Sequence, residues 1–347
     1  MHCFNERIQI NGQNASDEEI IEAFEAIQTA RGEITLTYFE FATLAAFYLF
    51  HKHKIEIAVL EVGLGGRLDA TNIVDANIAA ITPIDLDHTN LLGNTITEIA
   101  FEKAGIIKPN ALAISAENSP NLSIIQQADK NHATLLHGDK DFKYQQVSES
   151  SWQYQHQGKT LMLPMPRLQG AHQLQNSATA ITVLLNSPIA EQLTESIIGH
   201  GLLNTQLKGR FEQVIHNNCE FYFDVTHNPQ GAAILHDLLK PYRANGQKVI
   251  AVLGMLKDKD AANLASALKN DVDSWVLATL EGDRGQTASE LKERILPFLN
   301  EQHTVFMEDS VANACQKALS MQQNDDIILV FGSFHTVSEG LDWITQR

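Results

Sequence analysis

The chain has 347 residues, 44% of them hydrophobic, and a formal net charge of −17, so it is long enough for two or three domains but too acidic to be a good nucleic-acid binder. No apolar run approaches the roughly 20 residues of a membrane span, and the N-terminus lacks the apolar region of a signal peptide. Three scattered cysteines predict neither disulfides nor a zinc knuckle, so we expect a cytoplasmic protein.

The first part of the chain alternates apolar strands with helices. Continuous apolar runs, typical of buried parallel strands, occur at 55–62, 76–82 and 111–115. Helical spacing occurs at 38–51, 95–104, 122–131 and 171–185. Between these helices, residues 142–165 alternate polar and apolar side chains, which predicts small antiparallel strands.

A second alternating series begins after Gly209. Its strands are predicted at 219–225, 248–254, 274–280, 304–307 and 326–332. Its helices are predicted at 229–242, 260–269, 287–300, 310–322 and 335–346. This order predicts a doubly wound α/β domain, with a boundary near residues 206–210 that separates domains 1–206 and 207–347.

Candidate ligand residues follow the predicted strands of the first domain. Glu61 ends the run 55–62, immediately before the glycine cluster of residues 63–66, and ligands of open α/β sheets bind at the carboxyl ends of strands. The alternative is a Glu61 side chain that pairs with Arg67. The glycines do not have the spacing of a dinucleotide-binding fingerprint.

The next strand ends at Asp85, Asp87 and His88. Together with Glu61, these side chains suit Mg²⁺, which takes few protein ligands and keeps waters and phosphates. A capping or core role for His88 is the alternative. Lys103 lies in the helix that follows, where the residues alone favour nothing beyond a solvated lysine.

Polar residues also follow the first strand of the second domain. Asp224 and His227 lie at its carboxyl end, and Pro229 suits the first position of a helix. Arg210, at the domain joint, could reach a phosphate as a cis arginine finger does; the alternative is an interdomain salt bridge. The segments 254–260 and 332–335 end later strands of the same domain.

Eight segments resemble, in order, the motif series of folylpolyglutamate synthases, in particular the bacterial bifunctional dihydrofolate synthase form, a member of the Mur ligase superfamily. They are LTYFEFAT (36–43), LEVGLGGRLDATN (60–72), DLDHTNLLG (85–93), EKAGIIK (102–108), KGRFE (208–212), DVTHNP (224–229), MLKDKD (255–260) and GSFHTV (332–337). The resemblance runs from residue 4 to the C-terminus.

The resemblance implies a Mur-ligase-like α/β fold. Residues 1–206 would be an incomplete N-terminal P-loop-type ATPase domain that binds ATP and pteroate and holds a parallel sheet plus a small antiparallel sheet. Residues 207–347 would be the C-terminal doubly wound domain that binds the amino acid.

The resemblance also implies roles for single residues. Glu61 and His88 would be Mg²⁺ ligands in a family with two Mg²⁺ sites, and Lys103 would be a carbamylated lysine. The catalytic group would be Lys103, His227 and Arg210, with His227 near the transferred phosphoryl group. The ATP contacts would be Asn176, Arg210 and Asp224, and glutamate would meet Lys259 and Ser333. The pteroate or folate pocket would be lined by Thr37, Tyr38, Phe39, Glu40, Leu68, Asp69 and Ala70, with Phe39 stacking on the ring.

One departure from the family pattern concerns the phosphate-binding loop. The family begins with a P-loop, and shortly afterwards a Ser-Pro-His segment supplies another metal ligand, but no G-x-x-G-K-[ST] occurs in this sequence. We therefore expect a few dozen residues of the family's N-terminal segment to be absent. We predict that the chain as printed lacks ATP-dependent ligase activity and folds poorly in its first domain, whereas the domain after Gly209 folds on its own.

The implied activity is the ATP-dependent addition of L-glutamate to dihydropteroate, to reduced folates, or to both, through an acyl phosphate. The partners would be these small molecules, without nucleic acid or membrane, and the protein would be a monomer. One alternative is a non-catalytic remnant that keeps the pteroate pocket without ATP turnover. Another is a cell-wall Mur ligase with a nucleotide-sugar substrate, against which the aromatic segment 38–41 argues, unless that segment is ordinary helix core.

Overall fold

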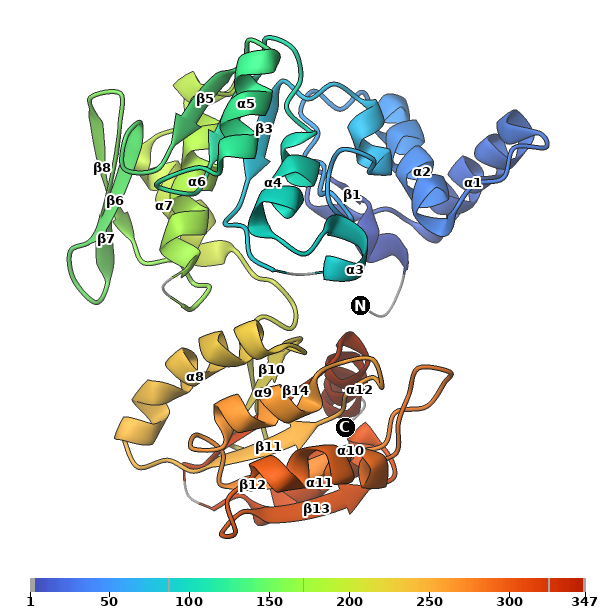
Figure 1. Ribbon diagram of the computed structural model, residues 1–347, viewed down its shortest axis with the longest axis vertical. Helices are drawn as coiled ribbons and strands as arrows, with labels where there is room; N and C mark the ends of the chain where they lie inside the picture. The colour runs from blue at the N-terminus through green and yellow to red at the C-terminus, as the bar shows by residue number, and fades with distance from the viewer. Residues whose placement is uncertain (1–3, 87, 171, 324, 346–347) are drawn as a thin grey trace. The chain divides into compact units, whose positions relative to one another are not determined.

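The computed structural model describes residues 4–86, 88–170, 172–323 and 325–345, and the chain divides into two compact units (Figure 1). The N-terminal unit contains the described residues of 2–166 and 171–204, and the C-terminal unit contains those of 167–170 and 205–347. Among the helices described, none combines the length and the apolar character needed to cross a membrane.

The N-terminal unit opens with a short hairpin and two packed helices. The elements are η1 (Phe4–Arg7), β1 (Gln9–Ile10), β2 (Gln13–Asn14), α1 (Asp17–Arg31) and α2 (Tyr38–Lys52). Each helix begins with a capping box, Ser16 with Glu19 in α1 and Thr37 with Glu40 in α2, which satisfies amides that the first helical turn leaves unpaired. Helix α2 was predicted, whereas α1 was not.

The predicted strand at 55–62 is wrong. In the described structure these residues form neither helix nor strand, and no residue from 56 to 62 makes a backbone–backbone hydrogen bond within the described ranges. Ile57 is 43% exposed and Val59 is 90% exposed. The apolar pattern predicted a buried strand, but a strand needs a neighbour to satisfy its backbone groups, and no described strand lies beside this run.

A parallel sheet of order β3-β4-β5 forms the centre of this unit. Its strands are β3 (Ile78–Ile81), β4 (Leu112–Ser115) and β5 (Thr134–His137). The associated helices are α3 (Thr89–Leu92), α4 (Ile96–Ala104), α5 (Leu122–Lys130) and α6 (His172–Leu185). Helices α4 and α5 share one core with Ala113 of β4, while α6 shares another with Ile114, because successive strand residues face opposite sides. The strands predicted at 76–82 and 111–115 are confirmed.

An antiparallel sheet of order β6-β7-β8 completes the unit, as the polar–apolar alternation of 142–165 predicted. Its strands are β6 (Phe142–Gln146), β7 (Ser151–His156) and β8 (Lys159–Pro164), followed along the chain by η3 (Ala190–Gln192) and α7 (Glu195–Asn204). Trp152 and Tyr154 of β7 are fully buried in the core that includes α6.

The C-terminal unit is a six-stranded sheet of order β13-β12-β11-β14-β10-β9. The strands are β9 (Glu212–His216), β10 (Cys219–Asp224), β11 (Val249–Leu253), β12 (Ser274–Ala278), β13 (Thr304–Glu308) and β14 (Ile327–Phe331). β9 pairs antiparallel with β10, and the other pairings are parallel. The five strands predicted for this domain are confirmed, and β9 is an additional edge strand.

Helices cover both faces of this sheet (Figure 1). They are α8 (Pro229–Ala244), α9 (Ala261–Leu268), α10 (Ala288–Ile295), η4 (Leu296–Phe298), α11 (Val311–Met321) and α12 (Phe334–Thr345). One core contains residues of α8, α9 and α10, and the other contains residues of α11 and α12. The neighbours β11 and β14 are therefore followed by helices on opposite faces, which makes their carboxyl ends the topological switch point where such sheets bind ligands.

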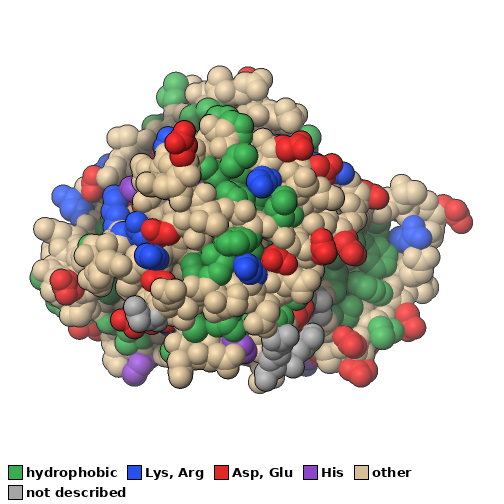
Figure 2. Space-filling model, turned by 90° about the horizontal axis from the view of Figure 1, so that it is seen from below, with side chains coloured by type: hydrophobic (Ala, Val, Ile, Leu, Met, Phe, Trp, Pro, Cys, Tyr) green, Lys and Arg blue, Asp and Glu red, His purple; other side chains and the backbone are tan. Residues whose placement is uncertain are grey.

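On one face of the structure the acidic side chains are dispersed (Figure 2). On the face shown in Figure 2, acidic side chains lie among hydrophobic and uncharged groups, with Lys and Arg side chains between them.

Candidate active site

A cavity of about 380 Å³ lies between α2 and the segment after the glycine cluster. Its lining residues are Leu36, Glu40, Thr43, Leu44, Phe47, Arg67, Leu68, Asp69, Ala70, Asn72 and Ile73. Four of the predicted pteroate residues, Glu40, Leu68, Asp69 and Ala70, are among them. The sequence analysis did not identify the other lining residues of α2, which are Thr43, Leu44 and Phe47, although positions 40, 43, 44 and 47 have the spacing of a single helix face.

The three remaining predicted pteroate residues lie outside this lining. Thr37 caps α2 by accepting a hydrogen bond from the Glu40 amide at 3.3 Å. Tyr38 is exposed, with the Arg7 guanidinium 5.7 Å from its ring centre. The Phe39 ring packs on the glycine cluster, where a Cβ atom at Gly63 would lie 2.7 Å from Phe39 Cζ. The stacking role expected for Phe39 therefore stays a prediction, and this cavity does not support it.

Asp69 connects the glycine-cluster loop to the segment that lines the cavity. Its Oδ2 accepts hydrogen bonds from the amides of Gly63 at 2.9 Å and Leu64 at 3.0 Å. Its Oδ1 accepts a bond from the Thr71 amide at 2.9 Å. A single carboxylate therefore ties the start of the loop to the segment that lines the cavity.

The same loop is fixed against the carboxyl end of α4. A Cβ atom at Gly66 would lie 2.9 Å from the Glu102 carbonyl oxygen, so a larger residue would be displaced. The Arg67 amide donates to that carbonyl at 2.8 Å, and the Arg67 guanidinium forms an ion pair with the Glu102 carboxylate at 2.9 Å. The partner of Arg67 is thus Glu102, and the alternative in which Arg67 pairs with Glu61 is wrong.

The candidate metal ligands lie on loops that meet at this junction. Glu61 is exposed at the end of the run 55–62, and His88 is exposed at the start of α3 with φ 50°. A Cβ atom at Gly65 would lie 2.9 Å from Leu92 Cδ2 and 3.7 Å from Glu102 Cβ, which brings together the loop after Glu61, helix α3 and helix α4.

Lys103 occupies the last turn of α4 and is half-buried. In the described ranges no three His, Cys, Asp or Glu side chains are arranged to hold a metal ion, and Asp87 lies outside those ranges.

Asp224 organises the carboxyl end of β10 in the C-terminal unit. The buried carboxylate accepts hydrogen bonds from the amides of Phe211 and Thr226, both at 2.8 Å. These bonds hold the turn that carries the exposed Arg210, in which Gly209 has φ 68° and Phe211 has φ 48°. Asp224 thus supports the turn that presents Arg210.

The ring of His227 is oriented by the backbone. Its Nδ1 lies 2.9 Å from the Val225 carbonyl oxygen, so that nitrogen donates to the carbonyl, and Nε2 takes no part in this bond. Asn176, the third predicted ATP contact, lies half-buried on α6 of the N-terminal unit.

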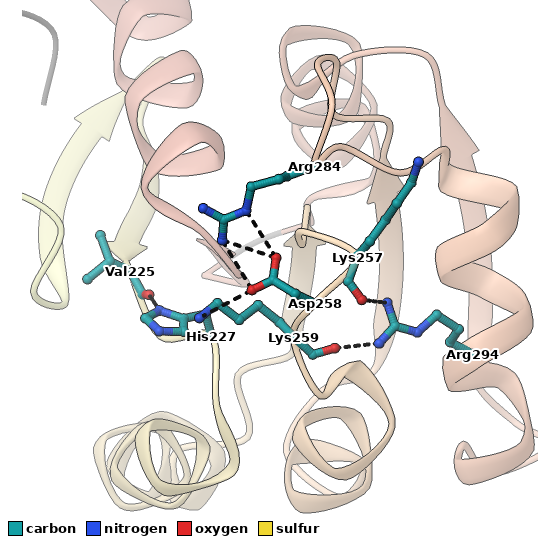
Figure 3. A network of polar contacts seen from close by, with 7 residues as sticks. All are labelled: Val225, His227, Lys257, Asp258, Lys259, Arg284 and Arg294. Carbon is teal, nitrogen blue, oxygen red and sulfur yellow. Dashed lines mark hydrogen bonds and ion pairs between the residues drawn. The ribbon is translucent and has the colours of Figure 1, made fainter. Parts of the chain in front are cut away.

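Lys259 and Ser333 both lie at the topological switch point of the C-terminal sheet. The Lys259 ammonium is 3.8 Å from the Asp258 carboxylate (Figure 3). Ser333 is buried, and its hydroxyl accepts a hydrogen bond from the Thr336 amide at 3.0 Å. The loop after β14 approaches the loop after β11 closely at Gly332. This residue has φ 113°, and a Cβ atom there would lie 2.5 Å from the Gly254 carbonyl oxygen.

Residues 15–184 match the Mur ligase middle domain, and residues 209–334 match the Mur ligase glutamate ligase domain. The dihydrofolate synthase/folylpolyglutamate synthase of Escherichia coli (strain K12) is 39% identical over 345 residues, which are 99% of this chain and 78% of that protein. This chain belongs to the dihydrofolate synthase/folylpolyglutamate synthase family of Mur ligases.

Solved structures of the family have the same fold. E. coli FolC in complex with DHPP and ADP superimposes with a TM-score of 0.88 at 39% identity, covering 99% of this chain and 79% of that one. A bifunctional folylpolyglutamate synthase/dihydrofolate synthase with Mn, AMPPNP and L-glutamate bound gives 0.85 at 39% identity, covering 98% and 79%. The predicted family and the Mur-ligase-like α/β fold are confirmed, and the family places the chain among folate ligases.

Proposed function

We propose that this protein is an ATP-dependent amide ligase that adds L-glutamate to dihydropteroate, to reduced folates, or to both. The observation that carries the proposal is the cavity on α2. Its volume of about 380 Å³ falls in the range of small-molecule sites, and it combines apolar walls with a few polar groups. Four of its lining residues, Glu40, Leu68, Asp69 and Ala70, are among those that the family resemblance assigns to the pteroate pocket.

The first chemical step joins two anions, because a substrate carboxylate attacks the γ-phosphate of ATP to give an acyl phosphate. In a protein of net charge −17, that step requires local cations. Glu61, His88 and a carbamylated Lys103 would hold Mg²⁺ at the junction of the glycine-cluster loop with α3 and α4. When bound, Mg²⁺ supplies neutralisation of phosphate charge.

The C-terminal unit contributes further groups to this step. The exposed Arg210 guanidinium would offset charge that develops on the transferred phosphoryl group, and Asp224 would act by holding the turn that carries it. The His227 ring, fixed through Nδ1, would direct Nε2 towards the phosphoryl group. Asn176 of α6 would complete the ATP contacts.

The second step is mainly a matter of positioning, since the amine of glutamate must be held near the acyl carbon. Lys259 and Ser333 lie where doubly wound sheets bind ligands. The Lys259 ammonium suits a carboxylate of the incoming amino acid. The glutamate amine would then attack the acyl phosphate, form the amide bond and release phosphate.

A cytoplasmic location and a monomeric state are further parts of the proposal. Cys219 and Cys315 are buried free thiols, which suits a reducing compartment. Size-exclusion chromatography with light scattering tests the monomer directly.

A second candidate function is pteroate binding without ATP turnover. The cavity favours it, because α2 and nearby residues of one unit form the lining without any contribution from an ATP site.

One experiment separates the two candidates by measuring dihydropteroate binding beside glutamate-dependent ATP hydrolysis. Binding with hydrolysis and amide formation supports the ligase, binding without hydrolysis supports the second candidate, and no binding contradicts both. Leu44→Asp places a charge in the cavity and should weaken binding about tenfold or more. The matched control, Ile21→Asp on the exposed face of α1, should leave binding unchanged.

A further inference from the structure

The segment 254–260 connects β11 to α9 and carries Lys259. It is a loop, yet side chains from other elements bond to its backbone carbonyls. The Thr336 hydroxyl donates to the Gly254 carbonyl at 2.7 Å, and Gln286 Nε2 donates to the Met255 carbonyl at 2.8 Å. The start of the loop is therefore fixed to two separate parts of the C-terminal unit.

Arg294 of α10 fixes the rest of the loop (Figure 3). One of its terminal nitrogens donates to the Lys257 carbonyl at 3.2 Å, and the other donates to the Lys259 carbonyl. The planar guanidinium thus bridges two carbonyls on either side of Asp258, a geometry that the single ammonium of lysine cannot reproduce.

Gln286 orients this guanidinium. Its Oε1 accepts a bond from Arg294 at 3.0 Å while its Nε2 holds the Met255 carbonyl, and the side chain is buried at 3% exposure. Both the oxygen and the nitrogen of the Gln286 amide are therefore hydrogen-bonded, and Gln286 and Arg294 hold the loop together.

The other side of the loop faces a second guanidinium, that of Arg284. The Lys257 amide donates to the Arg284 carbonyl at 3.0 Å, and the Arg284 guanidinium binds both oxygens of Asp258, at 3.0 and 3.1 Å. Asp258 lies between this guanidinium and the Lys259 ammonium (Figure 3). The backbone on both sides of Asp258 therefore determines where the Lys259 side chain begins.

We propose that Arg294, oriented by Gln286, is a positioning residue that holds the 254–260 loop so that the Lys259 ammonium meets a carboxylate of the incoming glutamate. The proposal rests on the glutamate-binding role of Lys259 in the proposed function. Three N–H groups of Arg294 donate to the two loop carbonyls and to Gln286, so the role assigned to Arg294 is to position Lys259 and not to contact substrate.

The test compares Arg294→Lys, which keeps the charge but not the fork, with Lys292→Gln. Lys292 lies on the same helix and has no hydrogen bond to the loop within the described ranges. Three quantities are measured on the whole chain: amide hydrogen exchange of 255–260, L-glutamate affinity by ligand-observed NMR, which needs no turnover, and dihydropteroate affinity.

We expect Arg294→Lys to accelerate exchange in the loop and to weaken glutamate binding about tenfold while dihydropteroate binding stays unchanged. Lys292→Gln should change none of the three. Glutamate binding that is equal in the two variants would overturn the proposal, as would a parallel loss of glutamate and dihydropteroate binding, which indicates general destabilisation.

Lys259→Met separates this inference from the proposed function. If Lys259→Met weakens glutamate binding and Arg294→Lys does not, the positioning role alone is wrong. If Lys259→Met leaves glutamate binding unchanged, the glutamate site is misplaced and the positioning role falls with it.

Discussion

The carboxylates of Asp69 and Asp224 support the candidate sites by accepting hydrogen bonds from backbone amides. Each accepts hydrogen bonds from main-chain amides on both of its oxygens. Asp69 thereby holds a wall of the cavity on α2, and Asp224 holds the turn of Arg210. Both were predicted as ligand contacts, and the structure adds a supporting role, because an ionised acceptor bonded to amides is a strong local tether.

Lys103 gives the first prediction at this scale. An unmodified ammonium beside Mg²⁺ would repel the metal, whereas a carbamate would attract it. In a form of the protein that has ligase activity, Lys103→Ala should therefore lower that activity roughly 100-fold, and a short-chain carboxylic acid added to the assay should restore part of it. Steady-state kinetics with and without acetate measure both effects, and full activity of the unaided variant would show that Lys103 is an ordinary solvated lysine.

Glu19 gives a second prediction, concerning pH. Its hydrogen bond from the Ser16 amide, and then its contact with His53, lower the pKa of this carboxyl below its ordinary value of about 4.5. The folded state therefore favours the ionised form, and this stabilisation is present above pH 4.5 and lost as pH falls through the lowered pKa.

The melting temperature of Glu19→Gln should consequently fall less between pH 7 and acidic pH than that of the unmodified chain. Glu18→Gln, an exposed neighbour in the same helical turn, is the control and should follow the unmodified chain. Parallel pH profiles for Glu19→Gln and the unmodified chain would contradict this prediction.

At the scale of elements, the junction between the glycine-cluster loop and α4 connects the cavity with the candidate metal site. Arg67 lines the cavity and is bonded to Glu102 through both its backbone and its side chain. Close approach at this junction depends on Gly105, where a Cβ atom would lie 2.5 Å from Arg67 Cα. Because the nearby Arg67 Cα is a backbone atom, a side chain at position 105 could be accommodated only by moving the main chain.

Gly105→Ala should therefore push the loop away from α4, destabilise the fold by about 1–3 kcal/mol and weaken dihydropteroate binding. The matched control is Gly201→Ala in α7, where a Cβ atom would meet nothing within 4 Å. That change should stabilise the fold by about 0.5–1 kcal/mol. Thermal unfolding and a binding titration measure both variants, and a neutral Gly105→Ala would refute the proposed packing role.

At the scale of the whole molecule, the two units differ in the size of their central sheets, three described strands in one and six in the other, and in the apolar side chains that they expose. The cores on the two faces of the C-terminal sheet are built from residues after 210. In the N-terminal unit, β3 pairs with β4 alone among the described strands, and the run 55–62 exposes Ile57 and Val59.

We therefore predict that residues 205–347 unfold cooperatively as an isolated fragment, whereas residues 1–204 give a broad transition at lower temperature. A smaller central sheet and exposed apolar side chains both reduce the stability of fragment 1–204. Circular dichroism melts of the two fragments measure the difference. A sharp, more stable transition for 1–204 would contradict the prediction.

Much of the fold was predictable wherever one local pattern was sufficient. The five parallel strands of the C-terminal sheet read as near-continuous apolar runs, because helices bury both of their faces. Helix α1 was missed although Ser16 and Glu19 have the spacing of a capping box, and strands β5 and β9 and helix α7 were also missed. Their short or weakly periodic patterns were not recognised.

The sequence alone determined the family, the order of most elements and the positions of the polar residues that follow the strands, because these depend on motifs and on periodicity along the chain. Only the tertiary structure decided that 55–62 is not a strand, that Arg67 pairs with Glu102, and that Arg294 and Gln286 hold the loop of Lys259. Each of these depends on which backbone atoms from distant segments lie within hydrogen-bonding distance. The spacing of residues along the chain does not predict such contacts.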